Sequence, residues 1–161
     1  MRDVNKAFIR NMFINLVDAD YLSLGQKLLK AGGKKIAPMP EPHLNALLQR
    51  GKVMNNDLRF HKMDNSACHS NVALLWNRKG YAICTGWALS DDNIWRQHSW
   101  CLDRRATIVE TTESREIYFG IKLEESEALL MWLNDGRERA AVGIRETMRC
   151  MEEYDRKTNP R

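Results

Sequence analysis

The chain has 161 residues, of which 43% are apolar and 29% are charged, and its formal net charge is +4. This composition is typical of one globular domain with its own core, and it excludes collagen-like and low-complexity proteins. No apolar run approaches the roughly 18 residues of a membrane-spanning helix, and no apolar signal segment follows Met1. We therefore expect a cytoplasmic protein with reduced cysteines, with export by a route without a cleaved signal left open.

The positive charge is concentrated in the first part of the chain. Residues 1–65 hold 11 Lys and Arg against six Asp and Glu. A basic segment of this kind can meet an acidic partner, but it lacks the interleaved aromatic residues of a single-strand binder and any groove-reading motif. We expect a solvated helix end and loop here rather than a nucleic-acid site.

The pattern predicts a single domain over residues 1–161, divided into parts of different character. Residues 1–65 are expected to be helical and basic, and residues 66–121 to hold one helix and a β-meander. Residues 122–155 are expected to be helical again, with a tail over residues 156–161. Helices before and after an antiparallel sheet define an α+β fold.

Apolar residues spaced three or four apart predict helices in the first part, and three prolines within residues 38–42 exclude a helix there. The expected elements are helices over 4–31, with a second one beginning after Asp18 and Asp20 and ending at Gly32–Gly33, then an extended segment over 38–42, a short helix around Leu44–Leu48 ended by Gly51, and a polar, irregular segment over 52–65.

The middle part changes to a strand-like pattern after Gly80, because β-branched and aromatic residues become frequent there. A helix-start signal at Asn65–Ser66 precedes one helix that should reach Gly80. The remaining expected elements are strands over 81–89, 94–102, 106–112 and 118–121, with turns at 90–93 and 103–105, and helices over 123–133 and about 137–154.

Cys68 follows the helix-start signal by two or three residues, which places it in the first turn of a helix. Unpaired amide groups and the positive end of the helix dipole favour an anion there, and a thiol pKa is lowered. Cysteines also occupy buried first turns for structural reasons, so position alone does not establish a nucleophile. Cys68 is a candidate nucleophile whose partners must be found elsewhere in the chain.

The predicted hairpin supplies a candidate base and a candidate acid. If three residues form its turn, Leu102 pairs with Ala106, and His98 then lies directly opposite Glu110 on the same face. A carboxylate beside an imidazole fixes the tautomer and stabilises the imidazolium, as the third member of a triad does. A two-residue turn would shift the register by one. An ordinary His–Glu pair on a hairpin surface is the non-catalytic interpretation.

Three motifs occur in the order Cys, His, acid. They are Ala67-Cys68-His69-Ser70-Asn71, Gln97-His98-Ser99-Trp100 and Val109-Glu110-Thr111-Thr112. This order resembles the papain-like cysteine hydrolase superfamily, in its transglutaminase-like and NlpC/P60-like branches. The resemblance implies a papain-like fold in which a Cys-bearing helix packs on a small antiparallel sheet, with Cys68, His98 and Glu110 as a catalytic triad.

The same stretch also resembles a loose group of small, uncharacterised phage and bacterial proteins. They share a Cys-His-x-Asn helix start, a Gly-aromatic-Ala strand, a His-x-Trp strand and a late Tyr-Phe-Gly. In this chain the Gly-aromatic-Ala strand is Gly86-Trp87-Ala88, and the late Tyr-Phe-Gly is Tyr118-Phe119-Gly120. The resemblance covers residues 65–121, about a third of the chain.

Further residues are expected to complete the site. The Cys68 backbone amide is a candidate oxyanion donor. Asn71, three residues along the helix, either donates a second hydrogen bond or braces the loop. Trp100, on the face of His98, is expected to form a wall of the substrate cleft. Gln97 points away from His98 on the strand and is not expected to serve.

No metal or cofactor is expected, although six potential ligands lie in the middle of the chain: His61, Cys68, His69, Cys84, His98 and Cys101. Zinc motifs present pairs such as Cys-x-x-Cys. The nearest pair here is His98-x-x-Cys101, whose members point to opposite faces of a strand. His69 faces about 100° away from Cys68 on the helix and is interpreted as structural or exposed.

Three function classes remain open. The first is a cysteine-dependent hydrolase or acyl transferase acting on an amide bond of a protein, peptide or peptidoglycan peptide, as a peptidase, amidase, deamidase or transglutaminase. The second is a non-catalytic binding or inhibitory module on the same fold, phage-encoded and directed at a host protein. The third is nucleic-acid binding through the basic first part. Neither a nucleic acid nor a membrane is the expected partner.

Overall fold

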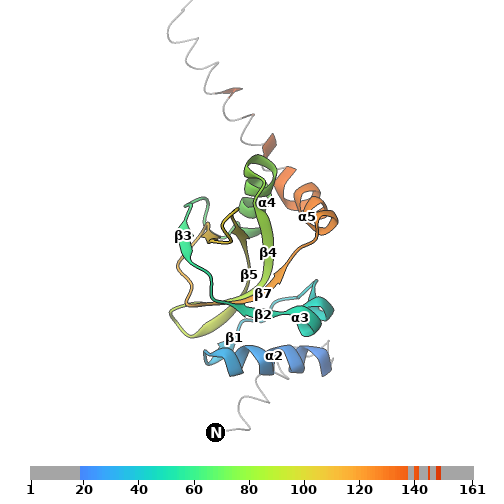
Figure 1. The fold of residues 1–161 in the computed structure, drawn as a ribbon, viewed down its shortest axis with the longest axis vertical. Coiled ribbons are helices and arrows are strands. Elements are labelled where there is room, and N and C mark those ends of the chain that lie inside the picture. The colour runs from blue at the N-terminus through green and yellow to red at the C-terminus, as the bar shows by residue number, and fades with distance from the viewer. Residues whose placement is uncertain (1–18, 138–139, 142–144, 146–147, 150–161) are drawn as a thin grey trace, which may run out of the picture.

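The computed structural model describes residues 19–137, 140, 141, 145, 148 and 149. A curled β-sheet forms the body, with α4 (Cys68–Lys79) and α5 (Glu125–Met131) side by side at one end (Figure 1). The pair α2 (Ala19–Ala31) and α3 (Leu44–Arg50) lies at the other end. The α+β class is therefore confirmed.

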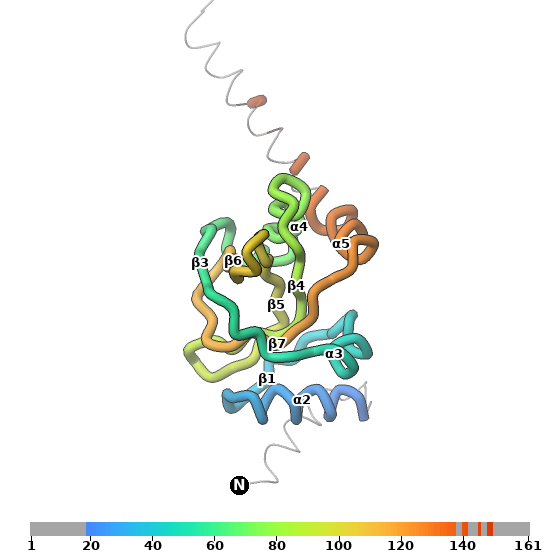
Figure 2. The backbone as a smooth tube through the Cα atoms, in the orientation of Figure 1, coloured from blue at the N-terminus to red at the C-terminus, as the bar shows by residue number. Residues whose placement is uncertain are grey.

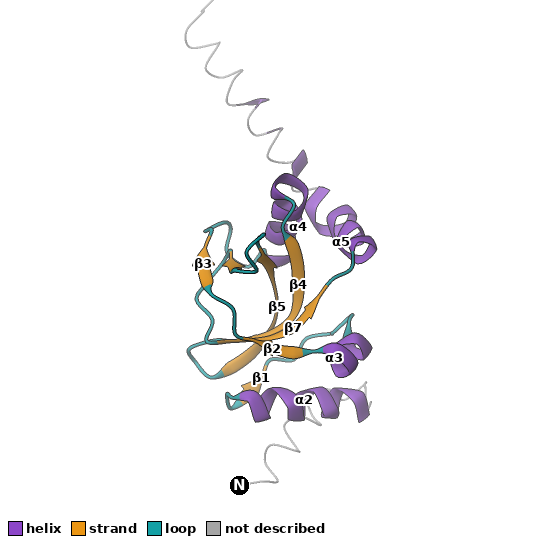
Figure 3. Ribbon diagram, viewed as in Figure 1, coloured by secondary structure: helices purple, strands orange, loops and turns teal. Residues whose placement is uncertain are grey.

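The sheet has seven strands and a mixed topology (Figure 3). Its main order is β2-β7-β4-β5-β6-β3, and β1 joins β5 in parallel. The strands are β1 (Lys35–Ile36), β2 (Lys52–Met54), β3 (Leu58–Phe60), β4 (Ala82–Leu89), β5 (Ile94–Leu102), β6 (Ile108–Glu110) and β7 (Ile117–Lys122).

The predicted meander is wrong at its last strand. Strands β4, β5 and β6 follow one another in antiparallel pairs, but β7 pairs with β4 and not with β6. The sheet is also not purely antiparallel, because β1 and β3 each pair in parallel. These additions come from the first part of the chain, whose strands no local pattern indicated.

Residues 52–65 are not irregular throughout, as the sequence suggested. Lys52–Met54 pairs with β7, and Leu58–Phe60 runs parallel to β6. The tube in Figure 2 shows Leu58–Phe60 (β3) beside β6. Both strands are only three residues long, and their partners lie about 50 or more residues away, so tertiary pairing outweighs local propensity.

The other predicted elements of the described part are close to the structure. The second N-terminal helix spans Ala19–Ala31, and α3 ends before Gly51. Residues 38–42 contain no helix or strand, as their prolines require. The helix predicted over 123–133 divides into α5 and a π-helical turn, η1 (Trp132–Gly136). The helix predicted before Asp18 and most of the one over 137–154 lie outside the described residues.

Two apolar clusters occupy opposite faces of strand β5. The larger cluster joins Val72 and Leu75 of α4 to Trp95 and Cys101 of β5. The smaller one, on the other face, is built from Met54, Cys84, Ala88, Trp100, Ile108 and Tyr118. Because side chains alternate along a strand, His98 shares the face of Trp100 and the smaller cluster. None of the described helices is both long enough and apolar enough to cross a membrane.

Candidate active site

Cys68 is the first residue of α4. The N-cap is Ala67 rather than Asn65 or Ser66, because Ser66 has a positive φ of 59° and cannot adopt the extended conformation of a cap. Ala67 has no side chain that could bind the free amides, and the first helical hydrogen bond runs from the Asn71 amide to the Ala67 carbonyl. The first-turn amides of α4 thus lack a side-chain cap, and the His69 backbone in this turn hydrogen-bonds the half-buried Cys68 thiol.

His98 and Glu110 form a buried hydrogen-bonded pair. The Nε2 atom of His98 lies 2.9 Å from Oε2 of Glu110. His98 is 2% exposed and Glu110 is 0% exposed. Since Nε2 is engaged by the carboxylate, Nδ1 is the ring nitrogen left for Cys68. The predicted neighbourhood of these two residues is therefore present in the structure.

The register that brings them together differs from the predicted one. Leu102 pairs with Ile108, and not with Ala106, so the strand after the turn is shifted by two residues. The connection is longer because the Asp103 side chain binds the amides of Arg105 and Thr107 within the loop. A shift of two residues preserves the face, and the long Glu110 side chain reaches His98 as a diagonal neighbour.

Five donors surround the Glu110 carboxylate. Oε1 accepts the amides of Thr111 and Thr112, both at 2.8 Å, and the Thr112 hydroxyl at 3.0 Å. Oε2 accepts His98 and the Tyr118 hydroxyl, the latter at 2.8 Å. The sequence alone assigns no role to the Thr-Thr pair or to the Tyr-Phe-Gly motif. The structure shows that both hold this carboxylate in place.

The ionisation of the three groups follows from these contacts. Burial alone would raise the pKa of Glu110, but the hydrogen bond and charge of His98 outweigh it and lower that pKa to about 2. Burial opposes the charged form of His98, yet Cys68 and Glu110 raise its pKa. Burial also acts to raise the pKa of the Cys68 thiol, but His98 and the backbone of Ser99 and His69 lower it overall.

Trp100 does not form a wall of a cleft, so that prediction is wrong. Its side chain is 0% exposed and lies in the smaller apolar cluster, with its ring centroid 6.3 Å from that of His98 and 5.0 Å from that of Tyr118. Gly120 leaves room for it, because a Cβ there would lie 2.6 Å from the Trp100 ring. Trp100 packs behind His98 and fixes the plane of the imidazole.

Asn71 braces a loop and does not face the thiol as a donor. Its Nδ2 group donates to the Asp64 carbonyl at 2.8 Å and to the Thr111 hydroxyl at 3.2 Å. Both amide hydrogens are used in this way, so the oxyanion role is wrong and the bracing role is confirmed. Through Thr111, Asn71 fixes the segment that carries Glu110.

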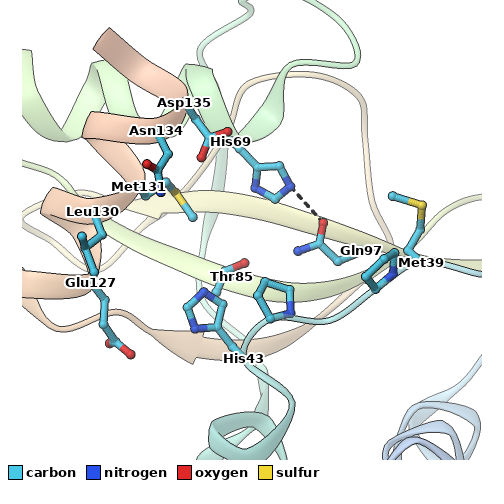
Figure 4. A pocket seen from close by; sticks show the side chains of 12 residues that line it. Met39, His43, His69, Thr85, Gln97, Glu127, Leu130, Met131, Asn134 and Asp135 are labelled. Atoms are coloured by element: carbon cyan, nitrogen blue, oxygen red, sulfur yellow. Dashed lines mark hydrogen bonds between the residues drawn. The ribbon is translucent and has the colours of Figure 1, made fainter. Parts of the chain in front are cut away.

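A second polar network lies on the opposite face of β5. His69 Nδ1 is 2.8 Å from the Ser99 hydroxyl, which in turn contacts the Thr85 hydroxyl at 3.0 Å. His69 Nε2 is 2.9 Å from Oε1 of Gln97 (Figure 4). Both ring nitrogens are engaged, so His69 is a structural residue, as its helix position indicated. Gln97 points away from His98, as predicted.

These residues form the floor of a cleft with a volume of about 560 Å³. His69, Thr85 and Gln97 line its base, while residues 39–43 and the α5–η1 segment form its two sides (Figure 4). The cleft begins one residue along the chain from Cys68 and one from His98. Cys68 and His98 do not line the cleft themselves, and His98 lies on the opposite face of β5.

The described cysteines differ sharply in environment. Cys84 and Cys101 are buried, and burial raises the pKa of both thiols, that of Cys84 to about 12. Cys68 alone among the described cysteines has a lowered pKa. No group of three or more His, Cys, Asp or Glu side chains in the described part of the chain is arranged to hold a metal ion. Cys150 lies outside the described residues.

Comparison with known proteins gives no match, whether to a protein-family model, to a curated protein or to a solved structure. The geometry of Cys68, His98 and Glu110 is therefore the basis on which a function can be inferred.

Proposed function

We propose that this protein is a cysteine-dependent hydrolase or acyl transferase that acts on an amide bond, with Cys68 as nucleophile, His98 as base and Glu110 as orienting acid. One observation carries the proposal. A buried imidazole is bound at Nε2 by an ionised carboxylate, while its other side faces a thiol of lowered pKa at an uncapped helix start. This is the arrangement that activates a thiol nucleophile.

The resemblance of the three motifs to the papain-like superfamily supports these roles of Cys68, His98 and Glu110. On the same resemblance we propose a papain-like fold. Cys-bearing helix α4 packs on β5 of the sheet, as that fold requires. The mixed sheet and the strands from the first part of the chain are additions to the expected pattern.

The proposed reaction begins with attack of the Cys68 thiolate on the amide carbonyl carbon. A C–S bond forms, and the carbonyl π electrons move to the oxygen. The backbone N–H of Cys68, in the uncapped first turn of α4, is the donor proposed for that oxyanion. The C–N bond then breaks, and the His98 imidazolium gives its Nδ1 proton to the leaving amine.

An acyl-enzyme thioester remains after the amine leaves. Neutral His98 takes a proton from water or from an acceptor amine, which attacks the thioester carbonyl and breaks the C–S bond. Water gives hydrolysis and an amine gives acyl transfer. Throughout both steps Glu110 stays ionised, held by its other four donors, and keeps the Nε2 proton of His98 in place.

Turnover of amide substrates tests this proposal. Wild-type protein is assayed against peptide, muropeptide and protein-glutamine substrates, with Cys68→Ala and Cys84→Ala as matched variants. Cys68→Ala should be folded and have no turnover, whereas Cys84→Ala, which alters a buried thiol of the smaller apolar cluster, should retain it. Full turnover by folded Cys68→Ala protein would end the proposal.

A substrate-independent measurement complements the assay. The rate of alkylation of Cys68 by iodoacetamide, followed by mass spectrometry across pH, reports the thiolate directly. The midpoint should lie below about 8.5, the ordinary value for a free cysteine, and should rise in His98→Gln. An unshifted midpoint, with no turnover of any substrate, would instead favour the non-catalytic binding module.

A further inference from the structure

The cleft with His69, Thr85 and Gln97 at its base has a charge opposite to that of the whole chain. Its ionisable lining residues in the described structure are Glu127, Asp135, His43 and His69, with no lysine or arginine among them. Burial lowers the pKa of both histidines, so both are neutral near pH 7. The two carboxylates therefore dominate the cleft, in a protein whose net charge is +4.

The two acids lie along one side of the cleft, on α5 and η1 (Figure 4). Glu127 accepts the Glu124 amide at 2.8 Å in the capping box of α5, which holds its carboxylate in a fixed position. Asp135 is exposed at the cleft, and its negative charge acts on the His69 ring from that position.

Apolar side chains line both sides of the cleft. Met39 and Pro40 line it from the proline-rich segment, and Leu130 and Met131 line it from α5. Met39 is 48% exposed and Leu130 is 59% exposed, so apolar surface that the fold leaves uncovered faces the cleft on both sides. A long aliphatic stem can pack between these walls while a charged end reaches the acids.

We infer that this cleft, whose floor residue His69 follows Cys68 in α4, binds a lysine or arginine side chain of the peptide whose amide Cys68 attacks. The inference rests on the proposed function and adds a substrate class to it. Apolar side chains on both sides of a cleft, with carboxylates along one of them, match the methylene stem and cationic end of those two side chains. An acidic side chain would meet Glu127 and Asp135 and be repelled, which provides selection against the wrong substrate.

Fluorogenic peptide amides test the inference when one position at a time is lysine, norleucine or glutamate. Norleucine keeps the aliphatic stem and lacks the charge. At the position that enters the cleft, kcat/KM should be about tenfold higher for lysine than for norleucine, as partly exposed ion pairs give, and lowest for glutamate. The lysine preference should weaken as salt increases.

Variants locate the effect in the cleft. Asp135→Asn combined with Glu127→Gln should reduce the lysine preference to within about threefold, while the norleucine peptide is turned over as before. Glu125→Gln is the matched control, because Glu125 is an exposed acid on the same helix that does not line the cleft. An unchanged preference in the double variant, or an equal loss in the control, would overturn the inference.

Binding to Cys68→Ala protein separates this inference from the proposed function. Calorimetric titration with the same peptides needs no turnover. Charge-selective binding without cleavage by the wild type would leave the cleft assignment standing and refute the enzyme. Cleavage that is indifferent to charge would do the reverse, and peptides that neither bind nor react would overturn the cleft assignment.

Discussion

Replacing Glu110 with glutamine should change which nitrogen of His98 carries the proton. The amides of Thr111 and Thr112 are fixed donors and require an oxygen at the Oε1 position. The glutamine NH₂ group must then occupy the Oε2 position, where it faces His98 Nε2. To accept from it, the imidazole must place its proton on Nδ1, the nitrogen that faces Cys68.

The size of the effect follows from the pKa values. Burial lowers the pKa of His98, but contacts with Cys68 and Glu110 raise it from 6.5 to about 9. Part of that rise comes from Glu110, so its charge stabilises the imidazolium relative to the neutral ring. The wrong tautomer adds a further loss, so turnover should fall by about 10⁴, the loss seen when a triad acid becomes its amide. Cys68→Ala should lose several orders of magnitude more.

Two assays check this result. Turnover gives the rate loss, and the pH profile of iodoacetamide alkylation should shift upward because neutral His98 no longer stabilises the thiolate. Tyr118→Phe is the matched control, since it removes one donor from the same carboxylate oxygen and leaves the charge. Its loss of turnover should stay within about tenfold. A Glu110→Gln protein with the wild-type alkylation profile would refute the reasoning, and losses equal to those of Cys68→Ala would assign Glu110 a different role.

Three further predictions concern stability. Burial raises the pKa of Glu41 to about 7, so its proton is held more tightly in the folded state and the free energy of unfolding falls as pH rises from 4.5 to 7. Relative to Glu41→Gln, wild type should lose about 3 kcal/mol over that range in urea unfolding. The same pH dependence of stability in both proteins would exclude this. Asn71→Ala should cost about 2 kcal/mol in the same assay, because the buried Thr111 hydroxyl and the Asp64 carbonyl lose their donor; a neutral change would contradict the bracing role. Gly120→Ala should lower the free energy of unfolding by about 2 kcal/mol, since its Cβ would lie 2.4 Å from the Thr85 carbonyl. A variant as stable as wild type would show that β4 and β7 move apart at no cost.

The sequence predicted the site better than it predicted the sheet. Cys68 at a helix start and His98 on a strand follow from local signals, namely a period change and a turn. The face shared by His98 and Glu110 depends only on side-chain alternation, so it persisted although the turn was longer than expected. A one-residue error in the same loop would have separated the pair.

The failures share a physical cause. The strand Lys52–Met54 forms only because β7 offers a free edge, and β7 turns to β4 because Gly86 and Gly120 allow those backbones close together. Such long-range pairing leaves no periodic signal in three residues. Trp100 is buried because it packs against Tyr118, and Asn71 braces the loop because it donates to Asp64 and Thr111. The spacing of residues along one helix or strand does not predict these contacts.

The stability of cysteine variants should distinguish a functional thiol from a structural one. Cys68 is half-buried and contacts a charged, buried imidazole, whereas Cys84 is 0% exposed beside Trp100 in the smaller apolar cluster. A residue placed for reactivity often contributes nothing to the stability of the fold. The free energy of unfolding of Cys68→Ala, measured in urea, should therefore equal that of wild type or exceed it by up to about 1 kcal/mol. Cys84→Ala removes packed atoms from a core and should cost about 1 kcal/mol. A loss above about 2 kcal/mol in Cys68→Ala would mean that the thiol, with His98 and Glu110, is an element of the fold, and the binding module would then be the better account.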